Sequence, residues 1–119
     1  DRGLEHGEHT GLGWIGGEVR AITPGDRRMK VPHMGWNALR IKETPPTLFA
    51  GINVGAHVYF VHSFGFVPTE QSCILAEVDY GPPIVAAIGK NNIAGTQFHP
   101  EKSQAIGLRF IANFLSWSP

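Results

Sequence analysis

A histidine and a glutamate lie two residues apart in the segment 95–103, between an apolar run typical of a strand and one typical of a helix. Histidine readily takes up and returns protons near neutral pH, and a nearby carboxylate can fix its tautomer and stabilise its cation. In extended chain, His99 and Glu101 share a face and could point into one cleft. The spacing also fits a structural arrangement, in which Glu101 offers negative charge to a helix N-terminus. Spacing alone leaves both interpretations open.

A second dense patch covers residues 31–37 and combines a histidine, a conformationally permissive glycine, an aromatic ring and an amide. Such a loop can bind a ligand or a partner through Trp36 and Asn37. Because tryptophan is highly buried on average, the same residues also fit a packed loop in which Trp36 fills the core.

The sequence offers no convincing nucleophile. Ser63 follows His62 directly, but adjacent strand residues face opposite sides and no glycine-flanked elbow surrounds the serine. Ser63 and Phe64 could instead offer backbone groups to a ligand at a strand end. Cys73 has neither a glycine-bounded turn nor a helix start beside it, so a structural thiol is predicted.

Neither a metal nor a cofactor is predicted. His6 and His9, with two nearby glutamates, resemble a metal cluster only weakly, since two imidazoles without cysteines make a poor zinc site and a solvated charged loop explains them. The glycine-rich stretch 11–17 lacks the lysine of a phosphate-binding loop.

Apolar alternation and turn residues predict the strands, at residues 18–22, 56–64, 72–78, 84–88 and 93–98. A turn is predicted at Pro24–Asp26, and residues 79–83 should close an antiparallel hairpin between the third and fourth strands. Within 56–64, Val58, Phe60 and His62 should share one face of the strand.

After Pro100 the apolar period becomes helical, with a predicted buried stripe of Ile106, Phe110, Ile111, Phe114 and Leu115. Ser103 is predicted to cap the start of this helix. The pair at 99 and 101 therefore lies at a strand-to-helix junction.

Composition predicts one folded domain, because 119 residues with 42% hydrophobic content suffice for a single core. Lysine plus arginine equals aspartate plus glutamate, ten of each, so no net field favours nucleic acid or a membrane surface. No apolar stretch approaches the ~20 residues that span a bilayer. The single cysteine cannot form an internal disulfide, which fits a reducing cytoplasm.

Three motifs, at residues 30–37, 58–63 and 95–103, together resemble the class I glutamine amidotransferase subunits of imidazole glycerol phosphate synthase. The last motif is typical of all class I amidotransferases, and the first points to the histidine-biosynthesis subunit. The resemblance implies a three-layer α/β fold, of which residues 1–119 form the C-terminal part of one domain with mixed strands and a terminal helix.

In that family a cysteine attacks the glutamine side-chain amide, and a histidine oriented by a glutamate moves the protons. The resemblance gives these roles to His99 and Glu101, and places Ser63 and Phe64 near the bound glutamine. The cysteine and the oxyanion donors would precede Asp1, so the chain as given is expected to be inactive alone, since one lost donor costs ~3 kcal/mol of barrier.

The resemblance also implies a heterodimer with a cyclase subunit, which receives the ammonia. Residues Trp36, Asn37, Tyr59 and Lys102 would lie on or near the face that meets it, which suits aromatic and cationic anchors. Two alternatives remain open: a noncatalytic docking module, and the glutaminase subunit of another class I amidotransferase.

Overall fold

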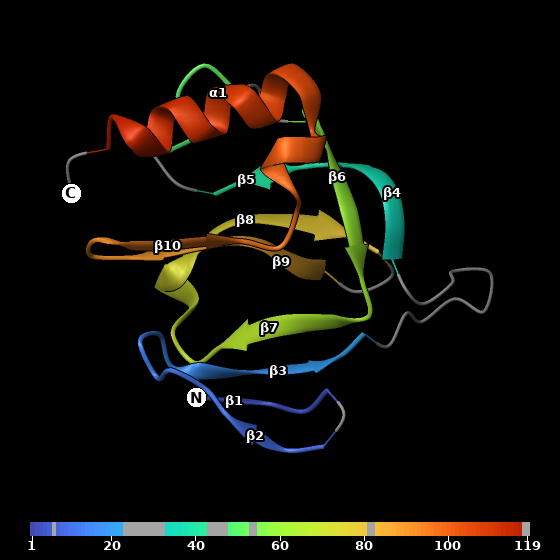
Figure 1. The fold of residues 1–119 in the computed structure, drawn as a ribbon, viewed down its shortest axis with the longest axis vertical. Helices are drawn as coiled ribbons and strands as arrows, with labels where there is room; N and C mark the ends of the chain where they lie inside the picture. The colour runs from blue at the N-terminus through green and yellow to red at the C-terminus, as the bar shows by residue number, and fades with distance from the viewer. Residues whose placement is uncertain (6, 23–32, 43–47, 53–54, 81–82, 118–119) are drawn as a thin grey trace.

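The computed structural model of the chain describes residues 1–5, 7–22, 33–42, 48–52, 55–80 and 83–117 (Figure 1). The elements are β1 (Arg2–Gly3), β2 (His9–Thr10), β3 (Gly17–Ala21), β4 (His33–Ala38), β5 (Arg40–Ile41), β6 (His57–His62), β7 (Phe64–Pro68), β8 (Ile74–Asp79), β9 (Pro83–Lys90), β10 (Ile93–Thr96) and α1 (Gln104–Leu115). Two short 3₁₀ turns, η1 (Gln71–Cys73) and η2 (Pro100–Lys102), precede β8 and α1 respectively. The predicted turn at Pro24–Asp26 lies outside the described residues.

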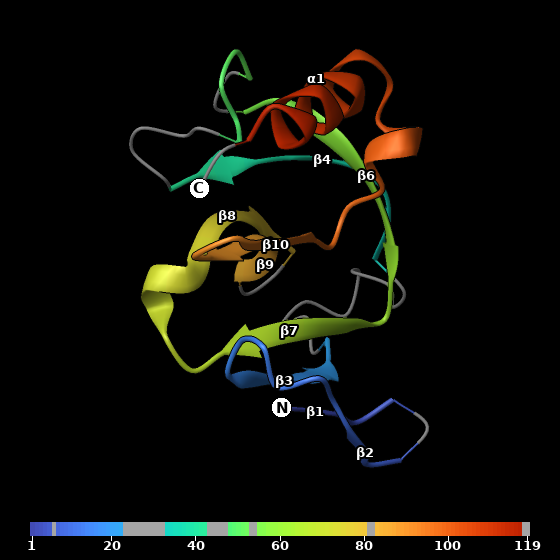
Figure 2. The ribbon, with the colours of Figure 1, turned by 60° about the vertical axis from the view of Figure 1, so that its left-hand side comes forward.

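The strands form three sheets, ordered β2-β1-β3-β7, β10-β9-β8-β5 and β4-β6. β1 and β3 run parallel, and the other described pairs run antiparallel. Figures 1 and 2 place the first of these sheets at the end of the molecule opposite α1. The described part of the chain contains no helix with the length and apolarity needed to cross a bilayer.

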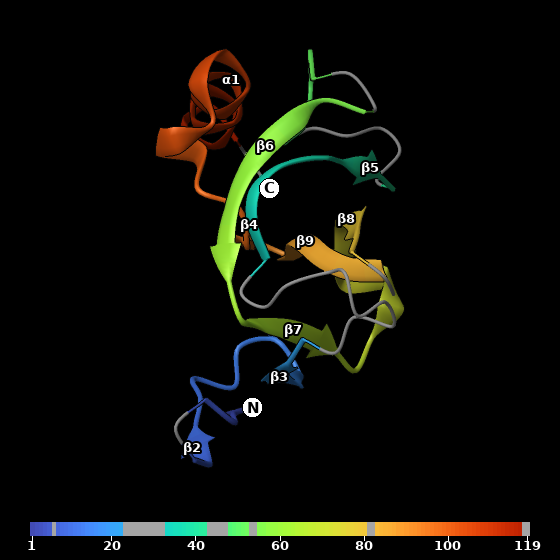
Figure 3. The same cartoon turned by 90° about the vertical axis from the view of Figure 1, so that its right-hand side faces the viewer.

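The two-stranded ribbon of β4 and β6 is the element on which the site is built. Figure 3 shows it curving between α1 on one side and β8 and β9 on the other. Because side chains alternate along a strand, one face of the ribbon packs inward and the other faces out. Along β6, Val58, Phe60 and His62 are buried, as the alternation predicted.

The inner face of this ribbon contributes to one hydrophobic core. Its fully buried members include Leu39, Leu48, Phe49, Val58, Phe60, Ala76, Val78 and Ala86. Phe98 and Phe110 extend the same cluster toward α1, with their rings 5.5 Å apart in an edge-to-face arrangement. The core therefore fixes the residue before His99 as well as the helix that follows it.

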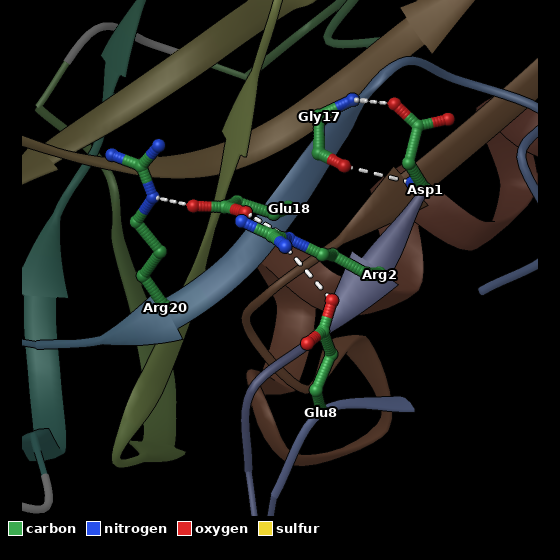
Figure 4. A network of polar contacts seen from close by, with 6 residues as sticks. All are labelled: Asp1, Arg2, Glu8, Gly17, Glu18 and Arg20. Carbon is green, nitrogen blue, oxygen red and sulfur yellow. Dashed lines mark hydrogen bonds and ion pairs between the residues drawn. The ribbon is translucent and has the colours of Figure 1, made fainter. Parts of the chain in front are cut away.

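Ion pairs hold the small N-terminal sheet together (Figure 4). Arg2 contacts the carboxylate of Glu8 at 2.8 Å and also that of Glu18, which pairs with Arg20 as well. The Asp1 carboxylate accepts a hydrogen bond of 3.0 Å from the Gly17 nitrogen. Arg2, Glu8 and Arg20 are exposed to water, which screens these ion pairs, so each pair contributes little to stability.

The hairpin between β8 and β9 is confirmed, since the two strands pair antiparallel out to Asp79 opposite Pro83. The strand predicted over 56–64 is wrong at its end, because the chain bends at Ser63 and enters β7 in another sheet. Two bonds impose this bend. The His62 ring bonds back to the Phe64 carbonyl at 2.9 Å, and the Ser63 carbonyl accepts from the Ile22 nitrogen at 2.9 Å.

The stripe predicted for the last helix is only partly correct. Phe110 is buried, but Phe114 is 47% and Leu115 79% exposed. The helix is instead attached through polar side chains: Arg109 and Asn113 both donate to the Ala50 carbonyl, at 3.0 and 2.9 Å. These bonds orient the C-terminal half of α1 by its polar face, which leaves its last apolar residues outside the core.

Ser103 lies at the N-cap position of α1, but the predicted side-chain cap is absent. Its hydroxyl accepts from the Tyr59 nitrogen at 3.0 Å and donates to the His99 carbonyl at 2.7 Å. The His99 nitrogen in turn donates to the Tyr59 carbonyl at 2.9 Å. Ser103 is only 1% exposed, so it is a buried link between β6 and His99, the residue that precedes η2.

Replacing Ser103 with alanine should lower the free energy of unfolding by about 2 kcal/mol, because the Tyr59 nitrogen would lose its partner in a buried place. Ser72→Ala, at an exposed serine of η1, is the matched control and should change little. Urea titration measures both, and an equal effect of the two substitutions would contradict the structural role of the Ser103 hydroxyl.

Gly107→Ala should also destabilise the protein, although alanine is the better helix former by about 1 kcal/mol. A Cβ at Gly107 would lie 1.7 Å from the Pro100 carbonyl oxygen, so α1 and η2 would have to separate. Overpacking of this kind costs about 1 to 3 kcal/mol. Gly3→Ala, where the added methyl meets open space, should be near neutral in the same urea titration.

Candidate active site

The side chains of His99 and Glu101 meet, as their spacing allowed. Nδ1 of His99 lies 2.8 Å from Oε1 of Glu101. His99 ends the extended segment after β10, while Glu101 lies in the single turn of η2, whose first residue is Pro100. The proline suits this place because the first helical position needs no backbone donor. The geometry supports the interacting pair over two unrelated structural roles.

The backbone of His99 is fixed to the edge of β6. Its nitrogen donates to the Tyr59 carbonyl, and its carbonyl accepts from the Ser103 hydroxyl and from the Lys102 nitrogen at 3.0 Å. Both backbone groups of Tyr59 are thus bonded to the strand-to-helix junction. The sequence predicts only a helix cap at Ser103. The positioning role of its hydroxyl depends on a contact 44 residues away, which local sequence does not reveal.

The electrostatics favour a charged Glu101. Its own backbone N–H and the bond from His99 both lower the pKa of its carboxyl group, and the charges of His99 and Lys102 act in the same direction. A carboxylate accepts only, so the proton of a neutral His99 lies on Nδ1. Nε2 then carries the lone pair, and this nitrogen of an exposed ring can take a proton from a substrate and return it.

Three of the residues predicted at a partner interface lie together on the outer face of the ribbon. Trp36 is opposite Tyr59 in the register, with their rings 5.8 Å apart, and Lys102 lies 6.0 Å from the centre of the Tyr59 ring. Trp36 is 48% exposed, and its outward neighbour Met34 is 62% exposed. Trp36 is therefore no core filler.

Asn37 lies on the opposite face from these three residues. Its amide nitrogen donates to the Asp79 carbonyl at 3.0 Å and lies 3.3 Å from Nε2 of His33, while its amide oxygen accepts from the Ala38 nitrogen at 2.8 Å. The side chain is thus engaged within the protein. Its placement differs from that of Trp36 because neighbouring residues of a strand alternate faces.

Ser63 and Phe64, predicted near a bound substrate, form the bend between β6 and β7. Both are partly buried. They follow β6, the strand whose Tyr59 holds the backbone of His99. Burial is the main cause that lowers the pKa of His62, the residue before the bend, and the charge of His99 adds to it. The His99–Glu101 dyad and this bend are therefore both attached to β6.

A buried pair of histidines, His33 and His62, lies behind the bend and was not predicted as a pair. Their rings face each other in the register of β4 and β6, with Nδ1 of His33 2.9 Å from Nε2 of His62. The alternation of β6 indicated that His62 is buried. Only the pairing of the two strands, which a single sequence does not reveal, places His33 opposite it.

Cys73 is 3% exposed within the core, as the prediction of a structural thiol required. In the described ranges, no group of three or more histidine, cysteine, aspartate or glutamate side chains is placed to hold a metal ion. His6 lies outside those ranges.

The family model for class I glutamine amidotransferases matches residues 5–116 of this chain. A protein of Rhodospirillum rubrum named imidazole glycerol phosphate synthase subunit HisH is 59% identical over 119 residues, which is all of this chain and 56% of that protein. The protein of the same name from Cereibacter sphaeroides is 55% identical over 99% of this chain and 55% of its own length. The chain thus spans about half the length of these relatives.

The fold agrees with the crystal structure of a Thermoplasma acidophilum protein described as a subunit of GMP synthase, with a TM-score of 0.64 over 85% of this chain and 48% of that one. The identity of 21% limits this likeness to the fold. The predicted α/β amidotransferase fold with mixed strands and a terminal helix is confirmed. Because the family model covers nearly its whole length, this chain belongs to the class I glutamine amidotransferases.

Proposed function

We propose that this chain is the histidine- and glutamate-bearing part of the glutaminase subunit of imidazole glycerol phosphate synthase. In this role it supplies the proton-transferring pair of a subunit that hydrolyses glutamine to glutamate and ammonia for a cyclase subunit in histidine biosynthesis. The carrying observation is the His99–Glu101 pair, held at 2.8 Å on η2, in a chain 59% identical to a protein of that name. This assignment implies a biosynthetic enzyme that acts in the cytoplasm.

The roles follow from the geometry of the pair. Nε2 of His99 gives a proton to the departing ammonia and later takes one from water, while the Glu101 carboxylate holds the ring and stabilises its cation. The nucleophile is a cysteine outside residues 1–119, since Cys73 is buried in the core. We propose no metal or cofactor for this reaction, whose proton transfers His99 carries out.

Glutamine would bind beside the bend formed by Ser63 and Phe64. The bend follows β6, and the same strand holds the backbone of His99 through Tyr59. A substrate placed against the bend would therefore lie near the dyad. Binding by backbone groups suits an amino acid, whose charged ends need donors and acceptors fixed in space.

The cyclase subunit would dock on the outer face of the ribbon, at Trp36, Tyr59 and Lys102. Half-exposed aromatic rings beside a cation are typical of residues that dominate binding energy at protein interfaces. The turn η2 carries Glu101 toward His99 and Lys102 toward Tyr59, so the dyad and the docking face are neighbours. Such closeness suits an enzyme that must pass ammonia directly to its partner.

The first test substitutes the dyad in the complete gene product assembled with its cyclase. His99→Ala should lower glutamine-dependent turnover by a factor of about 10² to 10⁴, which is the usual contribution of a general acid and base. Ammonia-dependent synthesis by the cyclase should persist, because it bypasses the glutaminase. Glu101→Gln should give a smaller loss, since the amide can still hold the ring but cannot stabilise its cation.

His57→Ala is the matched control, since His57 is an exposed histidine at the start of β6. It should retain both activities. An equal fall of glutamine- and ammonia-dependent synthesis in His99→Ala would count against the assigned role and favour a general loss of structure.

The second test concerns docking. Trp36→Ala should raise the Kd for the cyclase subunit by roughly 30-fold, the loss of about 2 kcal/mol that marks a central aromatic anchor. Trp14→Ala removes another exposed tryptophan, 64% accessible and outside the ribbon, and should leave Kd unchanged. Titration calorimetry of the two subunits measures both, and an unchanged Kd in Trp36→Ala would place the docking face elsewhere.

A further inference from the structure

The proposed reaction leaves two buried histidines without a role. His33 is 3% and His62 is 9% exposed, and they lie opposite each other on the inner face of the β4–β6 ribbon. Polar side chains are seldom buried unless every polar atom finds a partner, because an unpaired group costs about 1 to 3 kcal/mol. Two apolar side chains could fill the same space but could not form hydrogen bonds. The role of the two histidines is therefore to be sought in the hydrogen bonds that they form.

The hydrogen bonds of these rings form one series, called here the imidazole chain, which runs from the Asn37 amide through both rings to the Phe64 carbonyl. Each group donates to the next one in that order. The Phe64 carbonyl only accepts, so His62 carries its proton on Nδ1, which lies 2.9 Å from that oxygen. In the neutral ring, Nε2 of His62 must then accept from Nδ1 of His33 at 2.9 Å. Nε2 of His33 accepts in turn from the Asn37 amide at 3.3 Å. The Phe64 carbonyl thereby fixes both tautomers.

The environment keeps both rings neutral, as the imidazole chain requires. His33 lies between the rings of Phe60 and Tyr80, with centroids 4.8 and 4.1 Å away. Burial, assisted by the charge of His62, lowers the pKa of His33 to about 4. Burial also lowers the pKa of His62, against the opposing effect of the Phe64 carbonyl. At neutral pH the direction of the hydrogen bonds is therefore fixed.

The two ends of the imidazole chain show which part of the backbone it holds in place. At one end, the Asn37 amide also donates to the Asp79 carbonyl, which anchors the chain to the end of β8. At the other end, the His62 ring bends the backbone back on itself two residues later, at the place where β6 gives way to β7. The chain therefore holds one specific carbonyl, that of Phe64, against the rigid interior.

We infer that His33 and His62 are positioning residues, which fix the Phe64 carbonyl and so hold the Ser63–Phe64 bend in the conformation that receives glutamine. The inference rests on the proposed glutaminase function. The imidazoles do not touch the substrate, since their nitrogens are engaged with each other, with Asn37 and with the bend. Their removal should therefore affect substrate binding more than the proton transfers at His99.

The test compares two substitutions of similar shape in the complete gene product with its cyclase. His62→Asn keeps a donor near the position of Nδ1, whereas His62→Leu has none, and both remove the acceptor for His33. His62→Leu should raise KM for glutamine about fivefold to tenfold, the value of one net hydrogen bond, with a smaller change in kcat. His62→Asn should stay within about twofold of the wild-type KM.

A role confined to core packing would not produce this split, because both substitutions disturb the packing. Equal KM values for His62→Asn and His62→Leu would overturn the inference while leaving the glutaminase assignment intact. A wild-type protein that does not hydrolyse glutamine would overturn the proposed function itself, and the inference with it. Copurification of each variant with the cyclase subunit verifies that the variant glutaminase subunit is folded.

If His62→Leu does not fold, the same comparison is made at His33, the next ring of the imidazole chain. His33→Asn keeps the donor toward His62, and His33→Leu does not. KM should again rise only in the leucine variant, by about threefold, because the loss reaches the bend through His62. His57→Asn, at an exposed position of β6, should leave KM unchanged. Equal KM values for the two His33 variants would overturn the inference.

Discussion

The arrangement of the site depends on three hydrogen bonds, of which two join Tyr59 to the strand-to-helix junction and the third lies within the junction. The Tyr59 carbonyl accepts from the His99 nitrogen, the Tyr59 nitrogen donates to the Ser103 hydroxyl, and that hydroxyl donates to the His99 carbonyl. The three bonds close a ring, so neither residue can shift without breaking a bond in a buried place. A surface histidine thus gains the fixed backbone that its proposed catalytic role requires.

The glycine at 107 and the proline at 100 make this junction compact. Because Gly107 has no side chain, α1 can approach the Pro100 carbonyl more closely than any Cβ would allow. The helix then starts directly after η2, and the single turn brings Glu101 back to Nδ1 of His99. Close packing of backbone on backbone is rigid, which suits a pair that, in the proposed function, keeps one geometry through several proton transfers.

Local patterns predicted the elements of this site, and non-local contacts decided the rest. The β8–β9 hairpin, the buried face of β6 and the meeting of His99 with Glu101 follow from alternation and spacing over a few residues. The partner of the Ser103 hydroxyl lies 44 residues away, and that of His33 lies 29 away. The apolar stripe predicted for α1 is wrong at Phe114 and Leu115 for the same reason, since the orientation of the helix is set by carbonyls of the segment 48–52.

The β4–β6 ribbon separates the three proposed tasks, docking, positioning and catalysis, by geometry alone. Its outer face carries Trp36 beside Tyr59, its inner face carries the imidazole chain, and the free edge of β6 holds the dyad. Since strand residues alternate, Trp36 and Asn37 are adjacent in sequence yet serve opposite faces. A change at the outer face thus acts on the same two strands that hold the imidazoles and His99. The ribbon is therefore one physical connection between the proposed docking face and the proposed dyad, and η2, which carries both Glu101 and Lys102, is another.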